Sequence, residues 1–291
     1  MVFVVDKREA LDDVWWKSIL KKQKAEDMQT KSGNCSPSGW DVPVELRQWR
    51  NFEFADALEQ GLGPGLTSTF VEPPPAEEEK DRRLIVKCEN ERKEWILESA
   101  EGEPLLKAVG LADGFDLFAT NDSKALGPAF TLRSNAKQDS WTLSSVRCER
   151  CESRGTRLCG TRELARMSHY CETVGDGNAF CMDVEMPELL EDGSSSVMCS
   201  VCSDPDEAIG GSVLTSKRPK WNQRQKTLTL DFRGRCSMAS AKNFQLEAEN
   251  DPSKVTLLFG KVGANKFVLD YCNPLGTVQA FATALTATHW K

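Results

Sequence analysis

The spacing of hydrophobic residues changes from helical to alternating near residue 83. Before that point apolar residues recur at helical spacing, and one predicted helix face carries Leu11, Val14, Trp15 and Ile19. After it, apolar and polar residues alternate over short stretches, which predicts strands. The alternation is clearest in Thr227–Phe232, where every second residue is Leu or Phe.

Ten short strands are predicted in the second part of the chain, and glycine-containing turns such as Asp113-Gly114 separate several of them. They are Leu84–Cys88, Trp95–Glu98, Phe115–Ala119, Phe130–Leu132, Trp141–Val146, Met182–Met186, Thr227–Phe232, Phe244–Glu249, Val255–Phe259 and Lys266–Tyr271. No stretch alternates strands with helices as a parallel α/β sheet does. The pattern therefore predicts a mainly β domain.

The last stretch, Tyr271–Thr288, contains no charged residue and has apolar residues at helical spacing. Asn273 suits an N-cap and Pro274 the first helical position. A helix without a polar face is expected to be buried on all sides. Because a series of strands precedes it, we predict a closed antiparallel β-barrel around a buried C-terminal helix.

Three parts are predicted: a helical N-terminal segment over residues 1–70, an acidic Pro-rich linker over 71–82 and a barrel domain over 83–291. Lys17, Lys21 and Lys22 accompany Trp15 in the first helix. Two interpretations stay open for that helix. It is either a membrane-surface helix with an aromatic anchor, or a segment that packs on the protein or forms a tail.

Composition limits the classes of function. The 291 residues carry a net charge of −7, which argues against nucleic-acid binding. The N-terminus lacks the apolar core of a signal peptide, and no segment is apolar enough to span a membrane. We therefore expect a cytoplasmic protein with reduced thiols. The eleven cysteines are an odd number, which excludes a fully paired disulfide framework.

Three motifs follow one another near the C-terminus. Ser216–Phe232 reads SKRPKWNQRQKTLTLDF, Phe232–Leu246 reads FRGRCSMASAKNFQL, and Leu257–Leu285 reads LLFGKVGANKFVLDYCNPLGTVQAFATAL. In this order they resemble the C-terminal domain of the Tubby-like protein family, with Cys236 and Ala241 where the family's F-x-G-R-V-[ST]-x-A-S-V-K-N-F-Q signature has valines. The resemblance covers roughly residues 83–291 and is strong only over these three segments.

The resemblance implies a closed barrel of about twelve strands, threaded by the C-terminal helix, that binds phosphoinositide headgroups, chiefly phosphatidylinositol 4,5-bisphosphate. Family members are membrane-tethered adaptors in ciliary trafficking, or candidate transcription regulators. For this chain it implies a non-enzymatic adaptor at the inner face of the plasma membrane, with the cilium or the nucleus as further locations. We expect a monomer with a protein cargo that the sequence does not identify.

Arg133 is the leading candidate for headgroup binding. It lies in Thr131–Asn135, TLRSN, which is similar to the family's R-S-N motif, and a guanidinium can meet phosphate oxygens through two parallel hydrogen bonds. The other candidates are Lys107, Asn135, Lys137 and Lys242. The family's Lys-x-Arg pair after an L-L motif is missing from Leu105–Thr120, where Asp113 and Asp116 are acidic instead.

A second basic region runs from Val213 to Lys242, where Asp231 is the single acid. Its cations are Lys217, Arg218, Lys220, Arg224, Lys226, Arg233, Arg235 and Lys242. Such a run can attract an anionic leaflet by about 1 kcal/mol for each suitably placed cation. The alternative interpretation is a solvated hairpin face.

The cysteines predict a second kind of site. Two Cys-x-x-Cys pairs, Cys148 with Cys151 and Cys199 with Cys202, have the spacing of zinc ligands. The 47 residues between Cys151 and Cys199 exceed the spacing usual for a two-pair zinc module. We therefore expect no cofactor. The alternative is a scaffold of the same fold that has lost lipid binding and holds a structural zinc ion at these four cysteines.

Enzymatic chemistry has little support in the sequence. The chain has two histidines, His169 and His289, and neither lies in a recognisable nucleophile–base motif. We expect His169 to be a structural strand residue, and the protein not to be an enzyme.

Overall fold

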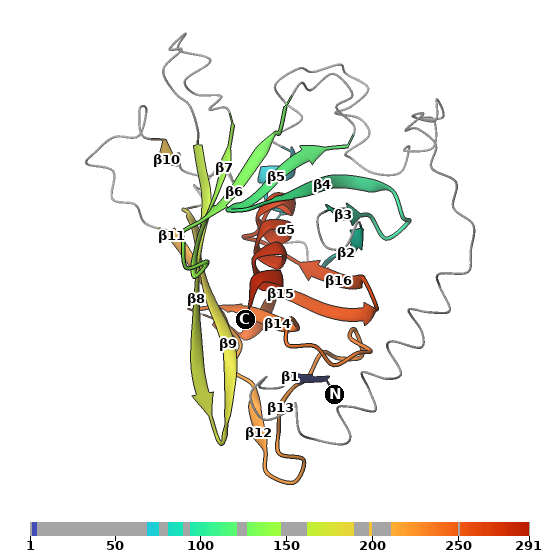
Figure 1. Ribbon diagram of the computed structural model, residues 1–291, viewed down its shortest axis with the longest axis vertical. Helices are drawn as coiled ribbons and strands as arrows, with labels where there is room; N and C mark the ends of the chain where they lie inside the picture. The colour runs from blue at the N-terminus through green and yellow to red at the C-terminus, as the bar shows by residue number, and fades with distance from the viewer. Residues whose placement is uncertain are drawn as a thin grey trace. The chain divides into compact units, whose positions relative to one another are not determined.

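The computed structural model describes residues 2–4, 69–75, 81–89, 94–120, 127–146, 162–188, 198–199, 211–249 and 251–290. Most of the described residues form one β-barrel around a single helix (Figure 1). The predicted helices before residue 69, and residues 76–80 of the predicted linker, lie outside the described residues. The helices among those residues thus remain a prediction.

Twelve antiparallel strands close into a ring. In ring order they are β2 (Arg82–Glu89), β3 (Glu94–Glu98), β4 (Pro104–Leu111), β5 (Gly114–Ala119), β6 (Phe130–Ser134), β7 (Ser140–Ser145), β8 (Arg162–Val174), β9 (Gly177–Pro187), β11 (Gly211–Ser216), β14 (Phe244–Ala248), β15 (Asp251–Gly263) and β16 (Lys266–Tyr271). The β8–β9 ladder, from Arg166 opposite Glu185 to Val174 opposite Gly177, completes the ring, and β16 pairs with β2. The predicted closed antiparallel barrel is confirmed.

Four short elements accompany the ring. A separate three-stranded sheet has the order β1 (Val2–Val4), β13 (Thr227–Leu230) and β12 (Lys220–Asn222). A further strand, β10 (Met198–Cys199), pairs with the first residues of β8. The prediction that Thr227–Phe232 is a strand is confirmed for its first four residues. The strand nevertheless belongs to the smaller sheet, since alternation reveals a half-buried strand without revealing its partners.

The C-terminal helix, α5 (Thr277–Thr286), runs through the ring (Figure 1), and all ten of its residues are buried. Two of its polar side chains, Thr277 and Thr286, have hydrogen-bond partners inside, whereas Gln279 Oε1 and the Thr283 hydroxyl have none among the described residues. The hydroxyl groups of Thr277 and Tyr271 lie 2.7 Å apart, and the Thr286 hydroxyl donates to the Thr283 carbonyl at 2.8 Å. The predicted buried helix is thus confirmed. Among the helices of the described residues, none combines the length and the apolar character that crossing a bilayer requires.

The helix begins later than predicted. Gly276, not Asn273, occupies the N-cap position, and Thr277 is the first helical residue. A side chain at Gly276 would overlap the carbonyl group of Val71, so glycine permits this close approach. The Asn273 amide instead donates to the Pro74 carbonyl at 3.1 Å. The start of the helix is therefore fixed by a segment about 200 residues earlier in the chain.

That segment belongs to the barrel unit. The chain divides into two compact units, and the one that contains the barrel takes in residues 70–291 together with residues 1–6. Phe70 is 1% exposed and Val71 is 8% exposed. The first residues of the predicted linker, 71–75, are thus part of the barrel unit, because apolar side chains at its start are buried.

Aromatic rings fill the barrel end at which α5 terminates and the short 3-10 helix η4 (Ala287–His289) follows. The His289 ring lies 4.8 Å from that of Trp141 and 5.3 Å from that of Phe115. Trp290 continues the layer to Phe244, at 5.4 Å. The C-terminus is therefore held by ring packing at the points where β5, β7 and β14 begin.

His169 joins this layer from β8. Its Nε2 lies 3.0 Å from the Thr286 hydroxyl. Because that hydroxyl donates its proton to Thr283, the Nε2–H of His169 donates to Thr286. Burial, and secondarily the neighbouring His289, lower the pKa of His169 to about 4.

The first prediction concerns pH. In the unfolded chain His169 has its ordinary pKa of about 6.5. Between pH 6.5 and pH 4 the unfolded chain therefore binds a proton at His169, whereas the folded chain does not. The associated stability is present above pH 6.5 and is lost as the pH falls toward 4. Urea unfolding should show that the wild type loses about 2 kcal/mol more between pH 7 and pH 4.5 than the His169→Gln variant does. Equal losses would contradict the assignment.

The second prediction concerns Phe70. Replacing it with Ala should lower the free energy of unfolding by about 3 kcal/mol, since a fully buried ring is removed. Glu72→Ala, at an exposed position in the same segment, is the matched control and should change it by less than about 0.5 kcal/mol. Denaturant titration measures both values. A Phe70→Ala effect as small as the control would show that this segment does not belong to the barrel.

Candidate functional site

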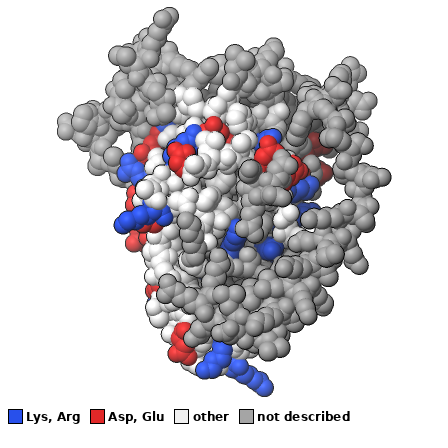
Figure 2. All heavy atoms as spheres, viewed as in Figure 1, with Lys and Arg blue, Asp and Glu red and all other residues white. Residues whose placement is uncertain are grey.

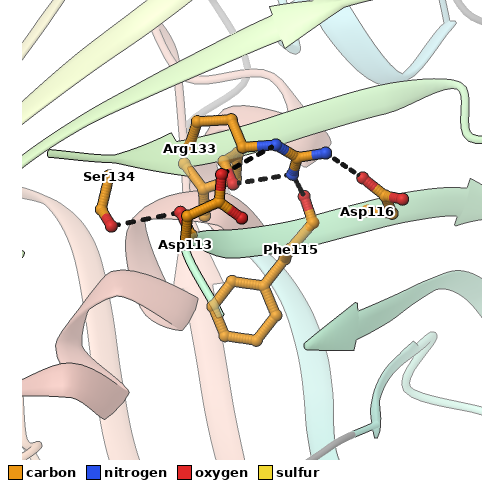
Figure 3. A network of polar contacts seen from close by, with 6 residues as sticks. Asp113, Phe115, Asp116, Arg133 and Ser134 are labelled. Carbon is orange, nitrogen blue, oxygen red and sulfur yellow. Dashed lines mark hydrogen bonds and ion pairs between the residues drawn. The ribbon is translucent and has the colours of Figure 1, made fainter. Parts of the chain in front are cut away.

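Arg133 lies near the end of β6, directly opposite Gly114 of β5. Its Nη1 donates to the carbonyl groups of Phe115 and Leu132, at 2.6 and 3.2 Å. Its Nη2 forms an ion pair with Asp116 (Figure 3). The Nε lies 3.9 Å from an Asp113 carboxylate oxygen. The guanidinium thus has partners on three of its nitrogen atoms.

A close approach of two strands creates this arrangement. A side chain at Gly114 would overlap the Leu132 carbonyl oxygen, so only glycine lets β5 run this near to β6. Asp113 precedes this glycine in the β4–β5 turn, and Asp116 follows it on β5. The turn therefore places one carboxylate on each side of the Arg133 guanidinium, as Figure 3 shows.

The charge at this rim is consequently not positive. One guanidinium faces two carboxylates, and the Arg133 side chain is 36% exposed. A phosphate group would have to displace Asp116 and tolerate Asp113 beside it. Headgroup binding by Arg133 stays a prediction, and the geometry describes a structural ion pair that joins β5 to β6.

Lys107 is not brought to Arg133. Its Nζ lies 2.8 Å from a carboxylate oxygen of Glu94, on the neighbouring strand β3. Gly114 of β5 pairs with Arg133 on one side and with Leu111 of β4 on the other, so Leu111 is the β4 residue level with Arg133. Lys107 is four residues from Leu111, which corresponds to about 13 Å along the strand. These two predicted ligands cannot hold one phosphate group together in this arrangement.

Asn135 and Lys137 lie in the β6–β7 turn, beside Arg133 in sequence. The Asn135 side chain closes the turn: its Oδ1 accepts from the backbone N–H of Asp139 at 3.2 Å, and its Nδ2 donates to the Asp139 carboxylate at 2.6 Å. Lys137 is exposed at the same turn. Lys137 is thus an exposed cation at this turn, whereas the Asn135 side chain is used for hydrogen bonds that close the turn.

Lys242 has a partner of another kind. Its Nζ donates to the Thr288 carbonyl at 3.1 Å, at the end of the C-terminal helical segment. Carbonyl groups at a helix C-terminus lack backbone partners and attract cations. Lys242 therefore binds the chain end to the residues before β14. The five predicted headgroup residues do not converge on one position.

Six of the eight cations between Val213 and Lys242 fall into two groups; of the other two, Lys242 binds the Thr288 carbonyl and Arg233 is exposed after β13. The first group forms ion pairs with neighbouring strands: Lys217 with Glu247 at 2.7 Å, and Arg218 with Glu172 at 2.5 Å. Arg235 also belongs to it, since it meets both carboxylate oxygens of the buried Asp270, at 2.5 and 2.6 Å. These cations hold strands together and have little capacity left for a ligand.

The second group consists of Lys220, Arg224 and Lys226, all exposed. None of the three forms an ion pair within the described part of the chain. All three lie on the hairpin of β12 and β13. Figure 2 shows Lys and Arg atoms projecting at the tip of the molecule where Figure 1 places that hairpin, with acidic atoms beside them.

The predicted zinc ligands Cys148, Cys151, Cys199 and Cys202 are not tested, because their side chains lie outside the described residues. In the part of the chain that is described, no group of three or more His, Cys, Asp or Glu residues is placed to hold a metal ion. The zinc site stays a prediction.

The two histidines have structural surroundings. His169 binds Thr286, as described above, and Nδ1 of His289 lies 3.2 Å from the Thr288 hydroxyl. Both rings pack against Trp141. The expectation that His169 is a structural strand residue agrees with this placement.

The described fold is a closed antiparallel β-barrel built around its own C-terminal helix. Residues 117–289 match the model of the Tub family. Because the match covers more than half of the chain, this protein belongs to the Tub family, and the predicted resemblance is confirmed.

Relatives come from animals and plants. The chain is 38% identical over 182 residues to Tubby protein homolog 1 of Caenorhabditis elegans, which covers 58% of this chain and 40% of the relative. It is 46% identical over 88 residues to Tubby-like F-box protein 5 of Oryza sativa subsp. japonica, covering 27% and 21%. To Tubby-related protein 1 of Mus musculus it is 46% identical over 78 residues, covering 27% and 14%. The chain thus spans less than half of each relative.

Sequence reasoning named the acids near Arg133 but did not foresee their pairing with it. The signal was present in Asp113-Gly114 and Asp116, since a tight turn followed by a strand places these residues at one rim. Which strand lies opposite was not contained in the local sequence, because the partner, Arg133, is 17 residues from Asp116.

The third prediction tests whether the two aspartates block Arg133. The double variant Asp113→Asn/Asp116→Asn should bind soluble inositol 1,4,5-trisphosphate about tenfold more tightly than the wild type, because two repelling charges are removed. Isothermal titration calorimetry measures both affinities. The matched control, Glu249→Gln/Asp251→Asn, changes the net charge equally at the exposed β14–β15 turn and should leave affinity unchanged. An equal gain in the control would indicate a general charge effect.

Proposed function

We propose that this chain is a non-enzymatic adaptor of the tubby type that associates with phosphoinositide-bearing membranes and carries a protein cargo. The observation that carries this proposal is the presence on one hairpin of three exposed cations, Lys220, Arg224 and Lys226, that form no ion pair with any described residue, in a chain whose net charge is −7. Family membership supports the adaptor role. On this proposal the protein is cytoplasmic and peripheral at the inner face of the plasma membrane, with the cilium or the nucleus as further locations.

The packing of both histidines supports the non-enzymatic part of this proposal. His169 and His289 contact aromatic rings and threonine hydroxyls of the C-terminal segment. A general base needs access to a substrate proton, and burial with a lowered pKa marks His169 as a packing residue. Protein cargo would then contact the outer surface of a rigid barrel.

The fourth prediction tests membrane association. The full chain should sediment with phosphatidylcholine vesicles that contain about 5 mol% phosphatidylinositol 4,5-bisphosphate, and remain in solution with phosphatidylcholine alone. Bound and unbound protein are measured after centrifugation. A chain that stays in solution with both kinds of vesicle would refute the lipid part of the proposal.

One observation favours a second candidate function. Arg133, the residue that the resemblance assigns to the headgroup, is paired with Asp116 and lies beside Asp113. A tubby-fold scaffold that has lost lipid binding would have this arrangement, and a structural zinc ion at Cys148, Cys151, Cys199 and Cys202, whose side chains are not described, would stabilise it. Metal analysis of purified protein separates the two: about one zinc ion per chain, together with no vesicle binding, favours the scaffold.

A further inference from the structure

The β12–β13 hairpin concentrates exposed cations at one tip. Lys220 lies on β12, opposite Thr229 of β13, and Arg224 and Lys226 lie in the turn that joins the two strands. All three are exposed. Their neighbours Lys217 and Arg218 both form ion pairs with glutamates, so among the described residues the cations without an ion pair begin at Lys220.

An apolar face anchors the hairpin to the barrel. Trp221 and Leu228 are cross-strand partners, and Leu228 forms a small core with Ala179 and Cys181 of β9, against which Trp221 packs. The Trp221 ring also lies over Gly175 and Gly177, where a side chain would collide with it. The hairpin is therefore fixed on the β8–β9 hairpin by its inner face, which leaves the alternate side chains outward.

The turn itself is ordered by Asn222. Its Oδ1 accepts hydrogen bonds from the backbone N–H groups of Arg224 and Gln225, at 3.0 and 3.1 Å, and its Nδ2 donates to the Gln225 side chain at 3.2 Å. This side chain-to-backbone closure sets the backbone at Arg224 before any ligand arrives. The cations thus project from a fixed frame on flexible stems.

Acidic residues near the hairpin do not cancel its charge. Glu172 of β8 is paired with Arg218, at 2.5 Å. Asp176 lies in the β8–β9 turn, between the two glycines under Trp221. Within the described residues, three cations therefore stand against one carboxylate at this tip, in contrast to the Arg133 rim, where two carboxylates stand against one cation.

We infer that the β12–β13 hairpin, through Lys220, Arg224 and Lys226, is the surface by which this protein docks on an anionic lipid bilayer. The inference rests on the proposed membrane association and locates it away from Arg133. The partner follows from charge complementarity: three long, exposed cationic side chains on one hairpin can each meet a different lipid phosphate of an anionic surface. Attraction of this kind follows surface charge density and is screened by salt.

The test compares two triple variants of the full chain that have the same net charge. Lys220→Gln/Arg224→Gln/Lys226→Gln removes the hairpin cations. The matched control, Arg83→Gln/Lys254→Gln/Lys266→Gln, removes exposed cations from β2, β15 and β16. Binding to vesicles of phosphatidylcholine with phosphatidylserine, and to vesicles with phosphatidylinositol 4,5-bisphosphate at equal surface charge, is measured by co-sedimentation at two salt concentrations.

The hairpin variant should partition about 100-fold more weakly onto both kinds of vesicle, at about fivefold for each cation, while the control stays within about twofold of the wild type. Wild-type binding should fall steeply when salt is raised, and soluble inositol 1,4,5-trisphosphate should not compete. A thermal unfolding midpoint equal to that of the wild type would show that each variant is folded. We expect this result because the changed side chains are exposed.

Three results would overturn the inference. If the hairpin variant binds vesicles as tightly as the wild type, the hairpin is not the docking surface, although the proposed membrane association is unaffected. Competition by the soluble headgroup would show a specific pocket instead of a charged surface. If the wild type binds neither anionic vesicle, the proposed association itself fails, and hairpin-dependent binding to an acidic polypeptide or to RNA would then identify a different partner.

Discussion

An uncharged helix inside a closed ring of strands is the constraint on which the structure depends. All ten residues of α5 are buried, so every strand that faces the helix must present apolar or small side chains to it. The backbone groups of helix and ring are satisfied within each element, which makes this dry interior tolerable. The rest of the molecule follows from it. Charges are excluded from the interior, both helix ends are closed by other segments, and any recognition chemistry must lie on the outer surface or at the rims.

The outer surface carries two classes of cation, and the division has a physical basis. A cation whose strand neighbours are acidic forms a cross-strand ion pair, as Lys107 of β4 does with Glu94 of β3, and then contributes to strand pairing. The Arg133 rim belongs to this class, since Asp113 and Asp116 face it. The hairpin of β12 and β13 differs because it extends beyond the ring. Its neighbours there are β1, which pairs with β13, and the β8–β9 hairpin, and within the described residues none of Lys220, Arg224 and Lys226 forms an ion pair.

The sequence allowed much of this fold to be predicted, and the failures have identifiable causes. Nine of the ten predicted strands lie in the ring, because a strand with one buried face has alternating apolar and polar residues that the sequence shows directly. The strands β4, β8 and β11 were not predicted. Ala108 and Gly110 in β4, and Ala165, Met167 and His169 in β8, have little preference for strands, and their conformation is imposed by neighbours in the ring. Pairing partners such as Arg133 and Asp116 depend on register between strands, which local pattern does not determine.

The same separation of interior from exterior explains how a family fold can keep its architecture while its charged surface changes. The motifs that carry the family resemblance contribute largely to buried positions: Phe232, Phe244 and Leu246 are at most 3% exposed, and Phe281 is fully buried. Arg133, by contrast, lies outside these three motifs and makes its polar contacts at the rim, where its side chain is 36% exposed. Acidic residues in and after the β4–β5 turn cost the barrel little, because Arg133 pairs with Asp116 and lies beside Asp113. Family membership therefore fixes the ring and its helix more firmly than it fixes any one anion-binding residue.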